Sequence, residues 1–198
     1  MYELPTKITI ADKDYPIRNN GDFRMVLDCF ECLQDEKLEH KYRILSAMII
    51  FYDGMNSVED VVNTFGDNLV EAVNQMNIFF NCGQVESVGA TQPHKLIDWK
   101  QDEQLVISAI NNVANREIRL DPFVHWWTFV GYYLAIGDCA LATVVSIRNK
   151  ILKGKKLESW ERDFKNNNPN YFVWNHQTIE EQEMEEYVRN LWNSNSQS

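Results

Sequence analysis

Two cysteines three positions apart offer the first candidate chemistry in this chain. Cys29 and Cys32 form a C-x-x-C pair, a spacing found in thiol redox sites and in zinc sites. A redox pair normally follows a strand and opens a helix, because the helix N-terminus stabilises the first thiolate. Here the pair falls inside a stretch with helical apolar spacing, with Phe30 between the cysteines. We interpret both as small apolar residues of a helix, the alternative being a metal site of Cys29, Cys32, Cys82 and a histidine.

The histidines do not follow a metal-binding pattern. No two of them stand four residues apart or beside a carboxylate pair with ligand spacing, and they are scattered over positions His40, His94, His125 and His176. His125 precedes two tryptophans in an apolar stretch. A hydrogen-bonded structural histidine is therefore favoured over a catalytic one at that position.

Three common catalytic and nucleotide-binding motifs are missing from the sequence. It contains no G-x-S-x-G, no Walker A motif and no G-x-G-x-x-G. Adjacent acids such as Glu59-Asp60 and Asp102-Glu103 point about 100° apart on a helix, so they do not share a site. We expect no catalytic residue, no cofactor and no metal, and hence a protein that is not an enzyme.

Apolar spacing predicts a mostly α-helical chain that begins with a short β-hairpin. Residues 7–17 alternate apolar and polar side chains on either side of Ala-Asp-Lys-Asp, which is typical of a hairpin. The helical period then begins with a stripe at Phe23, Val26, Leu27, Phe30 and Leu33. Further helices are expected over about 37–52, after Ser57 and from Asp67, the last with Val70, Val73, Asn74 and Asn77 in line. Another is expected over 98–114 with Asp98 as N-cap. Two more are expected, one from Asp121-Pro122 to Gly137 and one from Asp138.

The helix expected after Pro122 is apolar around most of its circumference. It carries Phe123, Trp126, Trp127, Phe129, Val130, Tyr132, Tyr133 and Leu134. Such a helix is either central in a fold or partly covered by a partner, and the central position is favoured. Trp99 and Tyr133 are candidate partner-binding residues.

Residues 166–198 are expected to form an Asn-rich linker and an acidic C-terminal amphipathic helix, appended to a compact helical domain of residues 1–165. A capping box from Thr178 to Glu181 begins this helix. Its apolar stripe supplies further candidate partner-binding residues, namely Met184, Tyr187, Leu191 and Trp192. Docking of this stripe on its own domain and binding to another chain both remain open.

Composition limits the function classes. The 198 residues are 44 % hydrophobic, enough for a core, and carry a net charge of -10. This charge disfavours nucleic acid and anionic membrane as partners, because both attract Lys and Arg. The most apolar run, from Phe123 to Ile136, is shorter than the roughly 20 residues that span a bilayer, and Met1–Thr6 lacks a secretory pattern. We therefore expect a protein that works inside the cell.

Three segments of the sequence resemble a known family. Residues 97–102, residues 120–129 with their His-Trp-Trp element, and Ile147-Arg148 resemble the bacteriophage gene-product-fifteen family of tailed phages of Gram-positive bacteria. The hairpin followed by Asp22-Phe23-Arg24 is similar to the start of that family, and the resemblance covers about residues 3–165. The family ends with a basic segment soon after the Ile-Arg helix, whereas this chain continues with an acidic helix.

The resemblance implies a tail assembly chaperone that accompanies the tape measure protein in the host bacterial cytoplasm. A tape measure protein is a long helical chain with exposed apolar faces, and an acidic, aromatic-rich helical protein suits such a partner. The expected partners are the phage tape measure protein or other tail proteins, with a homo-oligomer left open. The alternatives are a structural or tail-completion protein of the virion and an acidic protein-binding inhibitor.

Overall fold

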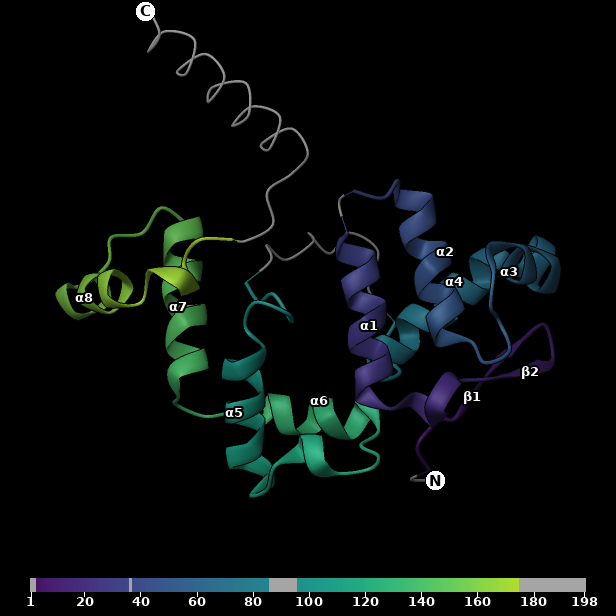
Figure 1. Cartoon of the computed structure of the whole chain (residues 1–198), viewed down its shortest axis with the longest axis horizontal. Helices are drawn as coiled ribbons and strands as arrows, with labels where there is room; N and C mark the ends of the chain where they lie inside the picture. The colour runs from purple at the N-terminus through teal and green to yellow at the C-terminus, as the bar shows by residue number, and fades with distance from the viewer. Residues whose placement is uncertain (1–2, 36, 86–95, 175–198) are drawn as a thin grey trace, which may run out of the picture.

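The protein is mostly α-helical, as the sequence predicts. The computed structural model describes residues 3–35, 37–85 and 96–174. The helices are α1 (Phe23–Gln34), α2 (His40–Phe51), α3 (Val58–Phe65), α4 (Leu69–Phe80), α5 (Glu103–Ala114), α6 (Trp126–Leu134), α7 (Ala140–Leu152) and α8 (Ser159–Asn167), with 3-10 turns η1 (Arg18–Gly21), η2 (Gly66–Asn68), η3 (Ile118–Leu120) and η4 (Pro169–Tyr171). The hairpin and α1–α4 lie on one side of the molecule, α5, α7 and α8 lie on the other, and α6 runs between them (Figure 1).

The predicted hairpin is confirmed. Strand β1 (Lys7–Ile10) pairs antiparallel with β2 (Lys13–Pro16), and Ile8 lies opposite Tyr15. The connecting residues Ala11 and Asp12 have positive φ angles of 47° and 60°, as a two-residue turn of a right-twisted hairpin requires. Because a two-stranded hairpin is marginal alone in water, it packs one face on the helices, where Ile8 and Ile10 are buried.

A continuous hydrophobic core, rich in aromatic rings, joins the hairpin to α1–α6. Phe23 at the start of α1 stacks on Phe129 of α6 with ring centroids 4.6 Å apart. Tyr52, which is fully buried after α2, donates its hydroxyl hydrogen to the carbonyl of Ala72 on α4 at 2.7 Å. Trp126 and Phe129 of α6 are buried in this core, whereas Leu134 at its end is 76 % exposed, so the helix contributes one face to the core.

The segment before α6 is extended, which corrects the expectation that a helix starts at Asp121-Pro122. Helix α6 begins at Trp126, with His125 as its N-cap. The N–H of Phe23 donates to the carbonyl of Val124 at 2.9 Å, and the N–H of Val124 donates to the Asp22 carboxylate at 3.0 Å. These long-range bonds hold the backbone extended, and they outweigh the local preference of Asp-Pro for a helix start.

Helix α5 also begins later than its sequence indicates. Asp98 is not its N-cap; its carboxylate accepts the N–H groups of Lys100 at 3.0 Å and Gln101 at 2.8 Å, which closes a turn before the helix. Helix α5 starts at Glu103. Helix α7 also starts one residue later than predicted, because its N-cap is Cys139 and not Asp138.

The buried face of α4 differs from the line of residues expected after Asp67. Val70 is 71 % exposed, and the buried residues are Ala72, Met76, Phe79 and Phe80. The C-terminal half of α4 thus enters the core, because the aromatic pair at its end makes the larger apolar surface.

The described chain ends at residue 174. The predicted acidic helix, with Met184, Tyr187, Leu191 and Trp192, lies outside the described residues, and the division at residue 165 stays a prediction. Across the described ranges, no helix combines the length and hydropathy needed to cross a lipid bilayer.

Candidate functional site

The C-x-x-C pair lies within α1 and carries no reactive thiolate. Cys29 is buried, with its sulfur 3.5 Å from the carbonyl oxygen of Ala47 on α2, and Cys32 is half-buried. Burial raises the pKa of both thiols, and the charge of Glu31 raises that of Cys32 further. Protonated thiols are poor nucleophiles and poor metal ligands. Within the described residues, no three His, Cys, Asp or Glu side chains are grouped closely enough to hold a metal ion.

His125 joins the N-terminal segment to the start of α6. Its Nδ1 accepts the N–H of Trp127 at 3.1 Å, and its Nε2 lies 3.0 Å from the carbonyl oxygen of Pro5. The second contact requires a proton on Nε2, so the ring is the neutral Nε2–H tautomer. Burial lowers the pKa of this histidine. His125 therefore has the structural, hydrogen-bonded role that the sequence favoured.

The two tryptophans of the His-Trp-Trp element bind the end of α4. The indole N–H of Trp126 donates to the carbonyl of Phe80 at 2.9 Å, and that of Trp127 donates to the carbonyl of Phe79 at 2.9 Å. The last carbonyls of a helix have no partner within the helix. The element thus satisfies the C-terminus of α4 while it starts α6.

A buried ion pair connects the other family-like residues. Arg148 on α7 makes two contacts with the carboxylate of Asp102, at 2.5 and 2.9 Å. It also donates to the carbonyls of Leu96 at 2.9 Å and Tyr171 at 2.8 Å. Arg148 therefore holds α7 against the segment that leads into α5, and both residues serve the fold.

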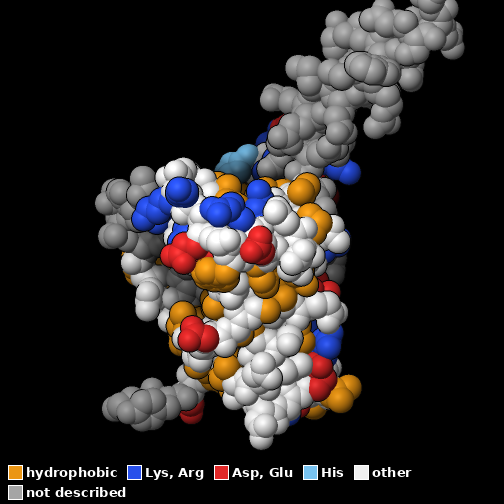
Figure 2. Space-filling model, turned by 90° about the vertical axis from the view of Figure 1, so that its left-hand side faces the viewer, with side chains coloured by type: hydrophobic (Ala, Val, Ile, Leu, Met, Phe, Trp, Pro, Cys, Tyr) orange, Lys and Arg blue, Asp and Glu red, His pale blue; other side chains and the backbone are white. Residues whose placement is uncertain are grey.

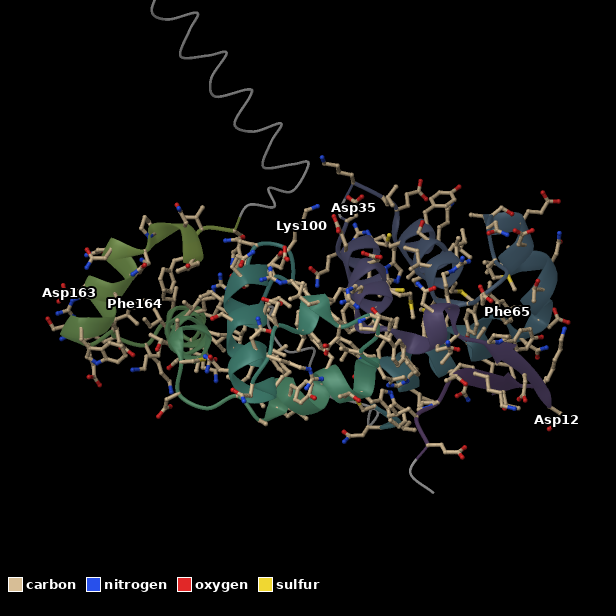
Figure 3. The ribbon with its side chains drawn as sticks, turned by 60° about the horizontal axis from the view of Figure 1, so that its bottom comes forward. Asp12, Asp35, Phe65, Lys100, Asp163 and Phe164 are labelled. Carbon is tan, nitrogen blue, oxygen red and sulfur yellow. The ribbon has the colours of Figure 1, made fainter. Side chains whose placement is uncertain are left out.

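A groove of about 880 Å³ lies between α1 and the residues that lead into α5. On the α1 side it is lined by Phe23, Arg24, Leu27, Asp28, Glu31, Cys32, Gln34, Asp35 and Lys37, and on the other side by Asp98, Trp99, Lys100, Glu103, Ile107 and Arg119. Lys100 and Asp35 mark its two sides in Figure 3. One of the family-like runs, residues 97–102, thus supplies part of its wall.

The floor of the groove is apolar. It is formed by Phe23, Leu27, Trp99 and Ile107. The Trp99 ring also stacks on Phe30 at 6.1 Å and lies 5.8 Å from the ring of Tyr133. Of the candidate partner-binding residues that the structure describes, Trp99 therefore lines the groove, and Tyr133 packs behind it.

The rim of the groove is charged, and most of its charges are paired. Lys100 forms an ion pair with Glu31 across the groove. The Asp28 carboxylate makes no ion pair or side-chain hydrogen bond with any residue in the described ranges. Its pKa is raised, first by burial and then by the nearby Glu31. An unpaired carboxylate in a groove with an apolar floor favours a ligand that brings a positive charge.

The groove is suited to binding and offers no activated nucleophile. Among the described residues, its lining includes no His, Ser or Thr, and the one cysteine there is Cys32, whose pKa is raised. Leu27, Asp28 and Glu31 are site residues that the sequence did not predict. They follow one another on α1 at helical spacing, but only the approach of residues 98–103 makes their face one wall of a groove.

These features define a helical protein with a peptide-sized surface groove beside a hydrogen-bonded His-Trp-Trp element. The chain belongs to the Bacteriophage Gp15 protein family, whose model matches residues 1–171. This match confirms the resemblance and supports a structural or tail-related phage protein. No curated protein and no solved structure matches the chain.

Proposed function

We propose that this protein is a phage tail assembly chaperone that binds the tape measure protein in the host bacterial cytoplasm, without catalysis. The observation that carries the proposal is the groove between α1 and residues 98–107, in a chain of the Gp15 family. Its apolar floor suits one face of an amphipathic helix, and its charged rim suits the polar flanks of that helix. The net charge of -10 keeps such a complex soluble.

Co-expression tests the proposal directly. The tape measure protein from the same tail module is expressed with and without this chain. We expect the tape measure protein to stay in the supernatant after centrifugation only in the presence of this chain, and to co-elute with it. A tape measure protein that precipitates equally in both samples would refute the proposal.

The groove is tested by a floor substitution. Leu27→Asp places a charge on the apolar floor, so we expect it to abolish co-elution. The matched control is Val70→Asp on α4, a residue that is 71 % exposed and not part of the groove lining. Circular dichroism must show that both variants keep the helical content of the parent protein.

The rim is tested by a charge reversal. Asp28→Lys removes the unpaired carboxylate, and we expect the affinity for the tape measure protein to fall roughly threefold to tenfold. Asp163→Lys on α8 makes the same change of net charge at the far end of the molecule (Figure 3) and should leave the affinity unchanged. Equal effects of the two variants would mean that only net charge matters.

A virion protein is the competing assignment, and particle composition decides between the two. A chaperone acts before the tail is complete, so mass spectrometry of purified particles should not detect this chain. Detection at a fixed number of copies per particle would replace the chaperone with a structural or tail-completion protein.

A further inference from the structure

The charge of this acidic protein is unevenly distributed along the chain. Residues 140–174 contain seven basic residues against three acidic ones, a net charge of +4. The following residues 175–198 contain five glutamates and a single base, Arg189, a net charge of -4. A basic end of the described structure is thus followed directly by an acidic segment.

The basic end also exposes large apolar side chains. Ile151 and Leu152 at the end of α7 are 41 % and 45 % exposed, and Trp160 on α8 is 54 % exposed. An ion pair of 2.6 Å between Lys150 and Glu161 holds the start of α8 beside the end of α7. Hydrophobic side chains spread over this end of the molecule, with Lys and Arg side chains gathered beside them (Figure 2). We refer to Ile151, Leu152, Trp160 and the lysines at 153, 155 and 156 as the α7–α8 face.

The described chain ends beside this face. The Trp174 ring lies 4.3 Å from the guanidinium of Arg148, about one helical turn before Ile151 and Leu152. Gln101 donates to the carbonyl of Val173 at 2.8 Å and fixes the exit point further. The family match stops at residue 171, so the acidic segment lies beyond it.

We propose that residues 178–192 of the same chain dock as an amphipathic helix on the α7–α8 face. The stripe of Met184, Tyr187, Val188, Leu191 and Trp192 would cover the exposed apolar side chains, and the glutamates would lie beside the lysines. Fifteen helical residues span about 22 Å, close to the length of the 13-residue α7. The three residues 175–177 reach about 10 Å, enough to turn back onto the face. Attachment in the same chain supplies an effective concentration on the order of millimolar.

Hydrogen exchange in the isolated full-length protein tests this contact. We expect amides of residues 184–192 to exchange at least tenfold more slowly than in a free peptide of that sequence. Leu152→Asp should remove this protection, because it places an acid among apolar and acidic groups. Val70→Asp, a matched change at an exposed site on α4, should leave it intact, and unchanged exchange in α1 and α2 verifies the fold of both variants.

Salt and dilution give a second readout of the same contact. Raising sodium chloride from 0.05 to 0.5 M should speed exchange in residues 184–192, because salt screens the attraction between lysines and glutamates. Protection that falls on dilution would assign the face to a second copy of the chain. Protection that arises only with a tape measure protein, or is absent throughout, would also overturn the proposal. None of these exchange measurements on the isolated protein depends on the proposed chaperone function.

Discussion

At the scale of single residues, the side chains that first suggest chemistry serve the structure. Cys29 and Cys32 are separate positions on α1, with thiols that burial keeps protonated. His125 is an N-cap and a link to Pro5. Cys29 and His125 each bury a polar atom together with its partner, which is how a core accommodates such an atom at low cost.

His125 gives the fold a pH dependence of known sign. Burial lowers its pKa below the unfolded value of about 6.5, so the unfolded chain binds the proton more tightly. Above pH 6.5, roughly the unfolded pKa, the His125 ring therefore adds no pH dependence to the free energy of unfolding. As the pH falls below that value, the free energy of unfolding decreases by at most about 1.4 kcal/mol per pH unit. Urea denaturation followed by circular dichroism between pH 7.5 and 5.5 measures this slope.

The assignment to His125 is checked with two histidine variants. His125→Asn keeps a side-chain acceptor for the helix start but does not titrate, so its slope should be smaller than that of the parent protein. His40→Asn, at an exposed position on α2, should keep the parent slope. Parallel curves for the parent protein and His125→Asn would contradict the prediction.

At the scale of helices, the end of α4 and the start of α6 stabilise each other through the tryptophans at 126 and 127. Trp126→Phe keeps most of the buried surface but leaves the Phe80 carbonyl without its donor, and should cost about 1–3 kcal/mol. Trp126→Ala also opens a cavity and should cost about 3–5 kcal/mol. Thermal and urea unfolding give both values.

Tyr42 on α2 provides the control for this series. It is 44 % exposed, and Tyr42→Phe should change stability by less than about 0.5 kcal/mol. If Trp126→Phe were equally harmless, the hydrogen bond to α4 would contribute nothing, and the element would act through packing alone.

Helices could be predicted from the sequence where apolar spacing alone determines them. Helix ends could not be predicted where distant residues determine them. The hairpin and α1 follow local patterns and were found. The start of α6 depends on hydrogen bonds between residue 124 and residues 22 and 23, about a hundred positions away. The same holds for the groove: Trp99 was visible as a candidate, whereas Asp28 becomes a site residue only because residues 98–103 pack opposite it.

At the scale of the whole molecule, the two ends differ in how they are held. The continuous core runs from the hairpin to Leu141 at the start of α7. Beyond this point, Val144 and Ile147 of α7 are fully buried, and Arg148 adds polar contacts to the rest of the described structure. This residue joins α7 to Asp102, to Leu96 and to Tyr171. A substitution here therefore acts on the connection between the two ends.

Arg148→Met should destabilise the protein by about 3–5 kcal/mol, because it leaves the fully buried carboxylate of Asp102 without a counter-charge. The double variant Arg148→Met/Asp102→Leu removes both charges and should recover much of this loss in urea denaturation, since the desolvation cost disappears with them. Lys7→Ala breaks an exposed ion pair with Asp14 and should leave the unfolding midpoint unchanged within error. If the double variant is no more stable than Arg148→Met, the contacts to the Leu96 and Tyr171 carbonyls, and not the charge pair, hold the two ends together.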